Sequence, residues 1–223
     1  MNILLVAATR AEIAPFIEAY EAMPTDALTH DITIALTGVG GVMSAVATLQ
    51  MLHRLHRTPH KPECVIQAGI AGAFTDRLEV GDVVEIASER FAQLGAEDRD
   101  GTFLDAFHHL HLADPNAHPF REAKIALQPH PAFFTALPKA AAATADRVSG
   151  TEASIAALRR AHPEVEVESM EGAAVAYACA VFGCVYFTQI RAISNAIEPR
   201  NRAAWQIGRA VKALNEVLIQ QLL

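Results

Sequence analysis

Short apolar runs alternate with amphipathic segments along nearly the whole of this chain, and this alternation limits the folds open to it. The apolar runs have the length and composition of buried strands, and the clearest are Asn2 to Ala8, Asp31 to Leu36, Cys64 to Gln67 and Val185 to Ile190. Segments with the apolar spacing of helices lie between them, as from Val42 to His56 and from Ala203 to Leu222. The alternation predicts an α/β fold whose largely parallel sheet is covered by helices on both faces.

Weaker signals complete this outline. We expect further strands at 82–87, 126–128, 143–148 and 165–168, a helix rich in Ala and Phe between the second and third of these, and helices after Thr9, over 151–162 and over 169–179. Residues 93–119 have no clear period and are predicted to form a long surface excursion. Because the chain has no internal repeat, no low-complexity segment and no obvious linker, residues 1–223 are predicted to form a single domain.

The composition argues against several classes of partner. Apolar residues make up 52 % of the chain and charged residues 19 %, which is enough apolar sequence for a sizeable core. The net charge is −7 and no run of Lys or Arg stands out, whereas nucleic-acid binding needs a basic face. The sequence predicts neither a signal peptide nor a membrane-spanning stretch. The three cysteines lack the spacing of a zinc site or a disulfide framework, so we expect a cytoplasmic protein without a metal.

Polar residues and glycines follow the predicted strands at the points where a ligand site is expected. Glu12 comes just after the first strand, Gly38 to Gly41 after the second, Gly69 to Gly72 after the third, and Ser194-Asn195 after the last. In open parallel sheets the ligand lies at the carboxyl ends of the strands. We therefore expect these segments to meet at one edge of the sheet.

Each polar residue has a structural interpretation beside a functional one. Glu171 begins an apolar helix, where an acid favours the positive end of the helix dipole, but its two acceptor oxygens also suit a sugar diol. Asn195 is typical of a turn or a helix N-cap, and alternatively presents an amide to the edge of a base. Glu12 is either a solvated helix residue or a general base on a rigid element. The residue types alone leave these alternatives open.

Two other patterns do not indicate a nucleotide-binding or metal-binding site. The glycines of Thr37 to Ser44 are followed by Met43 where a dinucleotide fingerprint needs its third glycine, and the segment lacks the Gly-Lys-Ser/Thr of a phosphate-binding loop. They are therefore predicted to pack a strand against a helix. Four histidines have no accompanying carboxylate or cysteine pattern and are predicted to lie in a solvated loop: His108, His109, His111 and His118. No cofactor is indicated.

Taken together, the ordered set of motifs resembles the purine nucleoside phosphorylase and nucleosidase superfamily. The matching segments run along nearly the whole chain. They are Glu12 after the first strand, Thr37-Gly-Val-Gly-Gly41, Gln67-Ala-Gly-Ile-Ala-Gly72, Val80-Gly-Asp-Val-Val84, Val148-Ser-Gly-Thr151, Glu168-Ser-Met-Glu-Gly-Ala173 and Arg191-Ala-Ile-Ser-Asn195. Each motif is weak by itself, and the ordered set is specific. The resemblance implies a three-layer αβα sandwich around a mixed, largely parallel sheet.

Within this superfamily the chain is similar to the futalosine hydrolases, which release hypoxanthine from a nucleoside with a benzoate-containing 5′ substituent during menaquinone biosynthesis. The Ser-Met-Glu-Gly-Ala-Ala run, the Ser-Asn pair and the segment Arg200 to Trp205 support this choice. The resemblance implies a purine nucleosidase that acts on a small-molecule nucleoside, without a cofactor. It also implies a homo-oligomer, at least a dimer, for which apolar surface on the long C-terminal helices is available.

The resemblance also implies a role for each site residue. Glu12 matches the general base that activates water. Glu171 matches the residue that binds the ribose hydroxyls, and Met170 beside it packs on the sugar. Ile70 falls in the substrate site, and Arg191 holds the water or orders the acids. Asn195 replaces an aspartate that protonates N7 of adenine in related methylthioadenosine nucleosidases.

The Asn195 replacement bears on the leaving base. Asparagine is not a general acid near neutral pH, but its amide can stabilise a 6-oxopurine through O6. It therefore favours hypoxanthine over adenine. Superfamily phosphorylases hold phosphate with an arginine in the turn after the third strand, and here Gln67 to Gly72 contains no cation, which favours water as the nucleophile.

Three alternatives remain: a methylthioadenosine/adenosylhomocysteine nucleosidase, a phosphorylase, and a non-catalytic nucleoside-binding or storage protein.

The residues that would bind the 5′ substituent are not identified by a motif. Arg10, Arg200 and Arg202 are candidates by charge alone, and a solvated surface role is the alternative for each.

Overall fold

The computed structural model describes all of residues 1–223 and contains five α-helices and ten strands. The helices are α1 (Arg10–Ala22), α2 (Gly41–Leu55), α3 (Glu152–Ala161), α4 (Gly172–Phe182) and α5 (Ile207–Leu222), with short 3₁₀ turns at Thr25–Ala27 and Arg202–Ala204. The strands are β1 (Asn2–Ala7), β2 (Asp31–Leu36), β3 (Cys64–Ala73), β4 (Val83–Phe91), β5 (Gly95–Glu97), β6 (Phe103–Asp105), β7 (Ile125–Ala126), β8 (Lys139–Thr144), β9 (Val167–Ser169) and β10 (Tyr186–Ala196).

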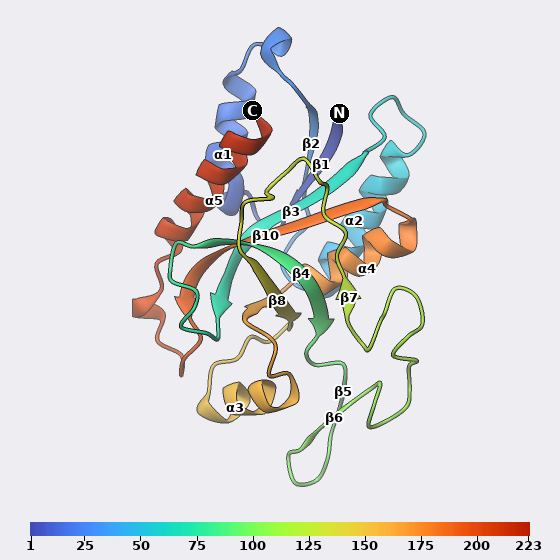
Figure 1. The fold of residues 1–223 in the computed structure, drawn as a ribbon, viewed down its shortest axis with the longest axis vertical. Coiled ribbons are helices and arrows are strands. Elements are labelled where there is room, and N and C mark those ends of the chain that lie inside the picture. Colours follow the sequence, from blue (N-terminus) through green and yellow to red (C-terminus); the bar gives the residue numbers. More distant parts are fainter.

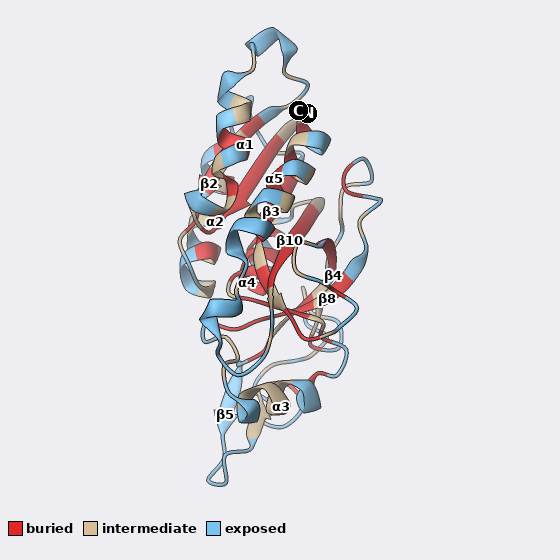
Figure 2. Ribbon diagram, turned by 90° about the vertical axis from the view of Figure 1, so that its left-hand side faces the viewer, coloured by how far each residue is buried: buried red, intermediate tan, exposed pale blue.

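Helices cover both faces of the central strands, which confirms the predicted three-layer α/β architecture. Helices α1 and α5 pack together on one face, and α2 and α4 pack together on the other (Figure 1). Successive residues of β1 point to opposite faces because the side-chain period of a strand is two. Ile3 and Leu5 therefore join the core beneath α1 and α5, while Leu4 and Val6 join the core beneath α2 and α4. The central strands are accordingly largely buried, whereas the outer helix faces and β5 are exposed (Figure 2).

The sheet is mixed and largely parallel, as predicted, but part of it closes on itself. Parallel pairs join β2 to β1, β1 to β3, β3 to β10, β4 to β8 and β8 to β9. Antiparallel pairs join β10 to β4, β3 to β9 and β4 to β7. The pairings of β3, β10, β4, β8 and β9 therefore form a ring, and β1 and β2 extend from it beside β3.

Strands β3 and β10 are longer than their apolar runs suggested, and β4 also continues beyond the expected residue 87, to Phe91. Strand β3 continues to Ala73 and β10 to Ala196, so Gly69 to Gly72 and Ser194-Asn195 lie within strands and not in the turns after them. The turn expected at Gly69 to Gly72 was wrong because small residues lower local strand propensity, and the turn interpretation of Asn195 does not hold. The parallel pairing of β3 with β10 continues through both segments and decides their conformation.

The region between β7 and β9 also differs from the prediction. The expected helix rich in Ala and Phe is absent, and residues 129–138 form turns that bury Phe133 and Phe134. Prolines at 131 and 138 bracket this segment and oppose a helix. The following strand lies at Lys139–Thr144 instead of 143–148. Helix α4 begins at Gly172, since 167–169 pair as β9.

The long excursion after β4 contains only the small β5–β6 hairpin and otherwise runs as loops away from the central sheet (Figure 1). Within it His109 contacts Asp105, and His118 lies 3.2 Å from the carbonyl oxygen of Ala180. Nowhere in the chain do three or more metal-binding side chains gather. None of the helices is both long and apolar enough to cross a bilayer.

Helix α1 has a break at Ile13 that a side chain of α5 stabilises. Ile13 has non-helical φ and ψ, and Pro15 lies in the same turn. The Asn215 amide occupies the place of the missing helical bond: its Oδ1 accepts from the N–H of Phe16 at 2.9 Å, and its Nδ2 donates to the carbonyl of Glu12 at 2.8 Å. Asn215 is buried, so both backbone groups depend on it. Asn215 thereby sets the position of the first turn of α1, which carries Glu12.

We predict that Asn215→Ala lowers the free energy of unfolding by roughly 2–5 kcal/mol, because two buried backbone groups lose their partner at once. Denaturant titration of the variant measures this loss. Gln220→Ala, an exposed change on the same helix, is the matched control and should stay within about 0.5 kcal/mol of the wild type. Equal stability of both variants would contradict the bridging role of Asn215.

Candidate active site

One pocket gathers most of the polar residues singled out by the sequence. It has a volume of about 320 Å³ and lies where the N-terminus of α1, the ends of β3 and β10, and the β9–α4 connection meet. Glu12, Ile70, Met170, Glu171 and Asn195 all line it. Other hollows are larger, up to about 770 Å³, but none of them contains these acids. The volume lies in the range of small-ligand sites.

Glu12 is held at the first turn of α1 by backbone groups. Thr9 is the N-cap, and its N–H and hydroxyl both donate to Glu12 Oε2 at 3.0 Å. Glu12 Oε1 accepts from the N–H of Ile70 on β3 at 3.1 Å. A carboxylate has about four acceptor positions, so Glu12 keeps acceptor capacity toward the pocket. Its placement on a rigid turn is what a positioned base requires.

Glu171 and Arg191 form a buried pair beside Glu12. Arg191, on β10, is only 1 % exposed, and its Nη1 lies 3.7 Å from Glu171 Oε2. Glu171 is 5 % exposed, and its Oε1 accepts from the N–H of Gly40 at 3.1 Å. Burial raises the pKa of Glu171 above its ordinary value, although the positive charge of Arg191 and the Gly40 hydrogen bond act in the opposite direction.

A glycine makes room for this pair. A Cβ atom on Gly69 would lie 2.9 Å from Glu12 Oε1 and closer still to Arg191 Nη1. Strand β3 therefore needs its smallest residue where the guanidinium crosses it. Arg191 does not line the pocket, and its Nε and Nη2 have no hydrogen-bond partner in the protein. It lies behind the acids and not at the pocket surface, so the assignment of Arg191 to direct substrate binding is wrong, and its role in ordering the acids stays a prediction.

Asn195 lies near the end of β10 with its amide oriented by neighbours. Its Oδ1 is 2.8 Å from the hydroxyl of Ser194, and its Nδ2 donates to the carbonyl of Ala196 at 2.9 Å. Only one of the two amide N–H groups is used by that bond, so the other remains for a ligand.

The pocket also contains residues that sequence reasoning did not assign. Glu168 and Ser149 line it together, and Trp205 closes another part of the wall. The three arginines considered for the 5′ substituent are all exposed, and the guanidinium carbon of Arg200 lies 5.2 Å from the centre of the Trp205 ring. The signal for Glu168 was present in the alternation Val165-Glu-Val-Glu168, but which face of this short strand points to the pocket depends on the fold.

Comparisons with known proteins identify the family and agree with this fold. A family model described as the phosphorylase superfamily matches residues 3–222. The chain belongs to the phosphorylase superfamily. The futalosine hydrolase of Streptomyces coelicolor is 33 % identical to it, over 98 % of this chain and 94 % of that protein. The 5′-methylthioadenosine/S-adenosylhomocysteine nucleosidase of Bacillus pumilus is 30 % identical, over 74 % of this chain and 68 % of that protein.

Solved structures share the fold of this superfamily member. The methylthioadenosine/adenosylhomocysteine nucleosidase of Colwellia psychrerythraea, in complex with adenine, aligns with a TM-score of 0.74 at 20 % identity, covering all of this chain and 96 % of that one. The enzyme of Neisseria meningitidis, in complex with methylthio-immucillin-A, aligns with a TM-score of 0.72 at 21 % identity and 98 % coverage of both chains. The named sequence relatives are nucleosidases, and this superfamily member is an N-glycosyl hydrolase.

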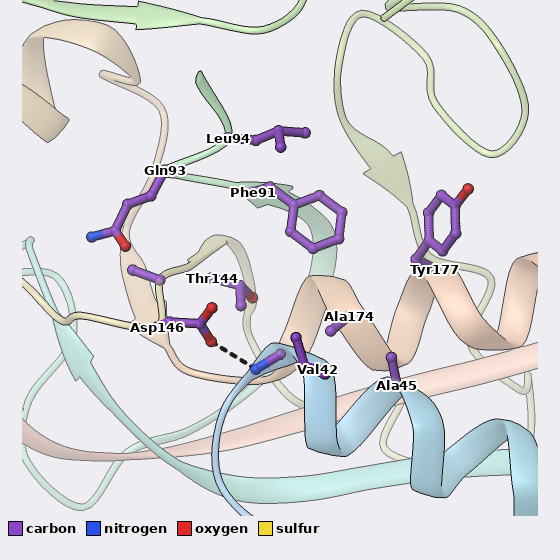
Figure 3. A pocket seen from close by; sticks show the side chains of 11 residues that line it. Val42, Ala45, Phe91, Gln93, Leu94, Thr144, Asp146, Ala174 and Tyr177 are labelled. Atoms are coloured by element: carbon purple, nitrogen blue, oxygen red, sulfur yellow. Dashed lines mark hydrogen bonds between the residues drawn. The ribbon is translucent and has the colours of Figure 1, made fainter. Parts of the chain in front are cut away.

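A second pocket, of about 320 Å³, lies next to the first and is mostly apolar (Figure 3). Val42 and Ala45 of α2, Tyr177 of α4 and Phe91 of β4 turn toward it. The glycine turn before α2 contacts an acid of each pocket: the N–H of Gly40 donates to Glu171 of the first, and the N–H of Gly41 donates to Asp146 of the second at 2.7 Å. The glycines thus hold acids in both pockets.

A further buried carboxyl, Glu89, lies beneath the start of α4. It accepts from Gln189 Nε2 at 2.8 Å and from the Thr144 hydroxyl at 3.1 Å. A Cβ atom on Gly172 would overlap its Oε1, so the carboxyl lies directly against the residue after Glu171. Burial raises the pKa of Glu89 from 4.5 to about 7, while these hydrogen bonds and the charge of Arg191 act to lower it.

The raised pKa of Glu89 predicts a pH-dependent stability. Between pH 4.5 and about 7 the folded protein keeps a proton that the unfolded chain loses, so this carboxyl makes the free energy of unfolding fall as the pH rises through that window. In Glu89→Gln this component disappears. The stability of the variant relative to the wild type should therefore increase from pH 4.5 to 7, by on the order of 3 kcal/mol at most.

Denaturant titration at several pH values measures this difference, and Glu97→Gln, an exposed change on β5, is the control. A difference between Glu89→Gln and wild type that stays constant across the window would show that Glu89 titrates normally.

Proposed function

We propose that this enzyme hydrolyses the N-glycosidic bond of futalosine, a 6-oxopurine nucleoside, and releases hypoxanthine in menaquinone biosynthesis. The observation that carries the proposal is the pocket in which the acids Glu12 and Glu171 face the amide Asn195. The likeness to the Streptomyces coelicolor futalosine hydrolase over nearly the full length of both chains supports it.

In the proposed mechanism the base departs with oxocarbenium-like character on the ribose. Glu171 accepts the ribose hydroxyls and Met170 packs against the sugar, which holds C1′ between the base side of the pocket and Glu12. Glu12 removes a proton from the attacking water. Arg191 keeps the two carboxylates at their positions by placing a buried positive charge beside them.

The leaving base is stabilised by a neutral amide. The free N–H of Asn195 donates to the purine as negative charge develops on it. A 6-oxopurine offers O6 and N7 as acceptors, whereas adenine leaves best when an acid protonates N7. An amide does not supply that proton, so the base leaves as an anion that Asn195 stabilises and that takes its proton from solvent, which supports hypoxanthine as the product.

Water is proposed as the nucleophile because the pocket wall from Gly69 to Gly72 has no group for a phosphate. This segment is strand and not an N–H nest, and the Ile70 N–H is already bound to Glu12. Arg191 is buried and faces Glu171. For the benzoate of the 5′ substituent we propose Arg200, which lies over the Trp205 ring of the pocket wall.

The test is product analysis after incubation with futalosine, inosine and methylthioadenosine, each with and without phosphate. Futalosine should yield hypoxanthine independently of phosphate. Glu12→Gln should lower kcat by at least about 100-fold with little change in substrate binding, since a general base contributes about this much. Glu18→Gln, an exposed change on the same helix, should keep wild-type rates.

Release of adenine from methylthioadenosine alone would assign the enzyme to the function named for the Bacillus pumilus relative, and phosphate-dependent release would make it a phosphorylase. If no nucleoside yields a base, the chain is a binding protein. A wild-type rate in Glu12→Gln would remove Glu12 from the mechanism.

We also propose that the enzyme is at least a dimer that pairs through α2 and α4. The sequence suggested the C-terminal helix α5 as the apolar surface for oligomerisation, but this helix exposes only Ile207 among its large apolar residues. In contrast, α2 and α4 expose a larger set: Val42, Met43, Val46, Tyr177 and Val181. Val42 is 76 % exposed, and an apolar surface of this kind marks an interface.

Light scattering coupled to size exclusion tests this pairing. The wild type should elute as a dimer or larger, and Val42→Asp as a monomer or weaker assembly, because the charge would be buried at the interface. Leu112→Asp changes an equally exposed leucine of the surface excursion and is the control. We further propose one domain over 1–223 and, from the three free cysteines, a cytoplasmic location.

A further inference from the structure

Glu168 is the one acid of the pocket to which the mechanism above gives no role. It lies on β9, is 3 % exposed and lines the same pocket as Asn195. A buried carboxyl at a ligand pocket is unfavourable unless its oxygens are bound. Its position in the pocket therefore calls for an explanation beyond packing.

The register of three strands places Glu168 opposite Asn195. Gly72 of β3 pairs with Glu168 of β9 on one side and with Asn195 of β10 on the other. Residues paired across a ladder project to the same face of the sheet, and adjacent strands are about 4.8 Å apart. The Cα atoms of Glu168 and Asn195 are thus separated by roughly 10 Å, with Gly72 between them.

Gly72 has no side chain to fill the space between Glu168 and Asn195. A Cβ atom there would lie 3.2 Å from Asn195 Nδ2 and closer to the side chain of Ile197. The result is an acceptor on one side and an amide donor on the other, with backbone and apolar atoms between them. A flat heterocycle with a donor and an acceptor on one edge matches this arrangement.

We propose that Glu168 is a specificity-determining residue, whose carboxylate accepts the N1–H of a 6-oxopurine while Asn195 donates to O6 or N7 of the same base. This inference rests on the proposed function and explains how the enzyme would select the purine base of its substrate. Adenine has an unprotonated N1 and would bring a lone pair against the carboxylate. The same group thereby attracts hypoxanthine and disfavours adenine.

Ser149 prepares Glu168 for this contact. The Ser149 N–H donates to Glu168 Oε2 at 2.8 Å and its hydroxyl donates to Oε1 at 2.9 Å. Burial raises the pKa of Glu168 above its ordinary value, although these two bonds act in the opposite direction by favouring the charged form. Two hydrogen bonds leave about two acceptor positions of the carboxylate for a ligand.

The first experiment compares kcat/KM for futalosine with that for its 6-amino analogue, which has the same 5′ group. Wild type should prefer futalosine, and Glu168→Gln should lower that preference roughly 10- to 100-fold, because Gln can also donate to N1 of adenine and a hydrogen bond to a charged group is lost. Glu166→Gln is the matched control: it lies on the same segment, but its carboxylate pairs with Arg77 outside the pocket.

The second experiment measures calorimetric binding of hypoxanthine and 1-methylhypoxanthine, whose methyl group replaces the N1–H. Methylation should weaken binding to the wild type about 10-fold or more and should have little effect on Glu168→Ala. A misfolded variant would bind both ligands poorly, whereas the proposal expects Glu168→Ala to lose only the difference between them. Thermal unfolding of each variant shows whether it is folded.

The two proposals fail separately. If the wild type releases adenine and no hypoxanthine, the proposed function is wrong. If the wild type prefers futalosine and Glu168→Gln keeps the full preference, or if N1 methylation is tolerated by the wild type, then Glu168 does not select the base and the proposed function stands.

Discussion

The parallel ladder between β3 and β10 is the constraint on which the rest of the site depends. It runs from the pair Cys64–Tyr186 to the pair Ala73–Ala196. Its register sets Arg191 opposite Gly69 and Asn195 opposite Gly72, so each of these two polar side chains projects beside a glycine of β3. A shift of one residue would send both side chains to the other face of the sheet. The same ladder of backbone hydrogen bonds therefore positions both Arg191, which lies beside the acids, and Asn195, which is proposed to contact the base.

The buried charges explain why the acids belong together. Arg191 is almost fully enclosed, and an isolated charge in such a place is strongly unfavourable. Glu171 supplies a partner at 3.7 Å, and Glu12 lies against the same side of Gly69 as the guanidinium. The charge of Arg191 also acts on Glu89, whose pKa it lowers. The acids in turn are bound by backbone N–H groups of Gly40 and Ile70. This network keeps carboxylates of different elements at defined positions in a pocket that is otherwise mostly apolar.

Residues outside the pocket support the helix ends that carry its acids. Asn215 of α5 replaces a helical hydrogen bond of α1 and stabilises the break that follows Glu12. Helix α4 begins at Gly172, directly after Glu171, and Glu89 lies against that glycine. Residues far apart in the chain thus determine where the two pocket acids point, although neither Asn215 nor Glu89 lines the pocket.

The sequence by itself determined the α/β class, most strands and helices, and a set of polar residues near the strand ends, because apolar periodicity and the ordered motifs are local properties. The extension of β3 and β10, the turns at 129–138 and the ring of strands were decided only by tertiary structure, since strand pairing overrides local propensity. The same holds for Glu168. Its alternating segment identified a strand, but only its pairing with Gly72, a residue almost a hundred positions away, placed its carboxyl across the pocket from Asn195.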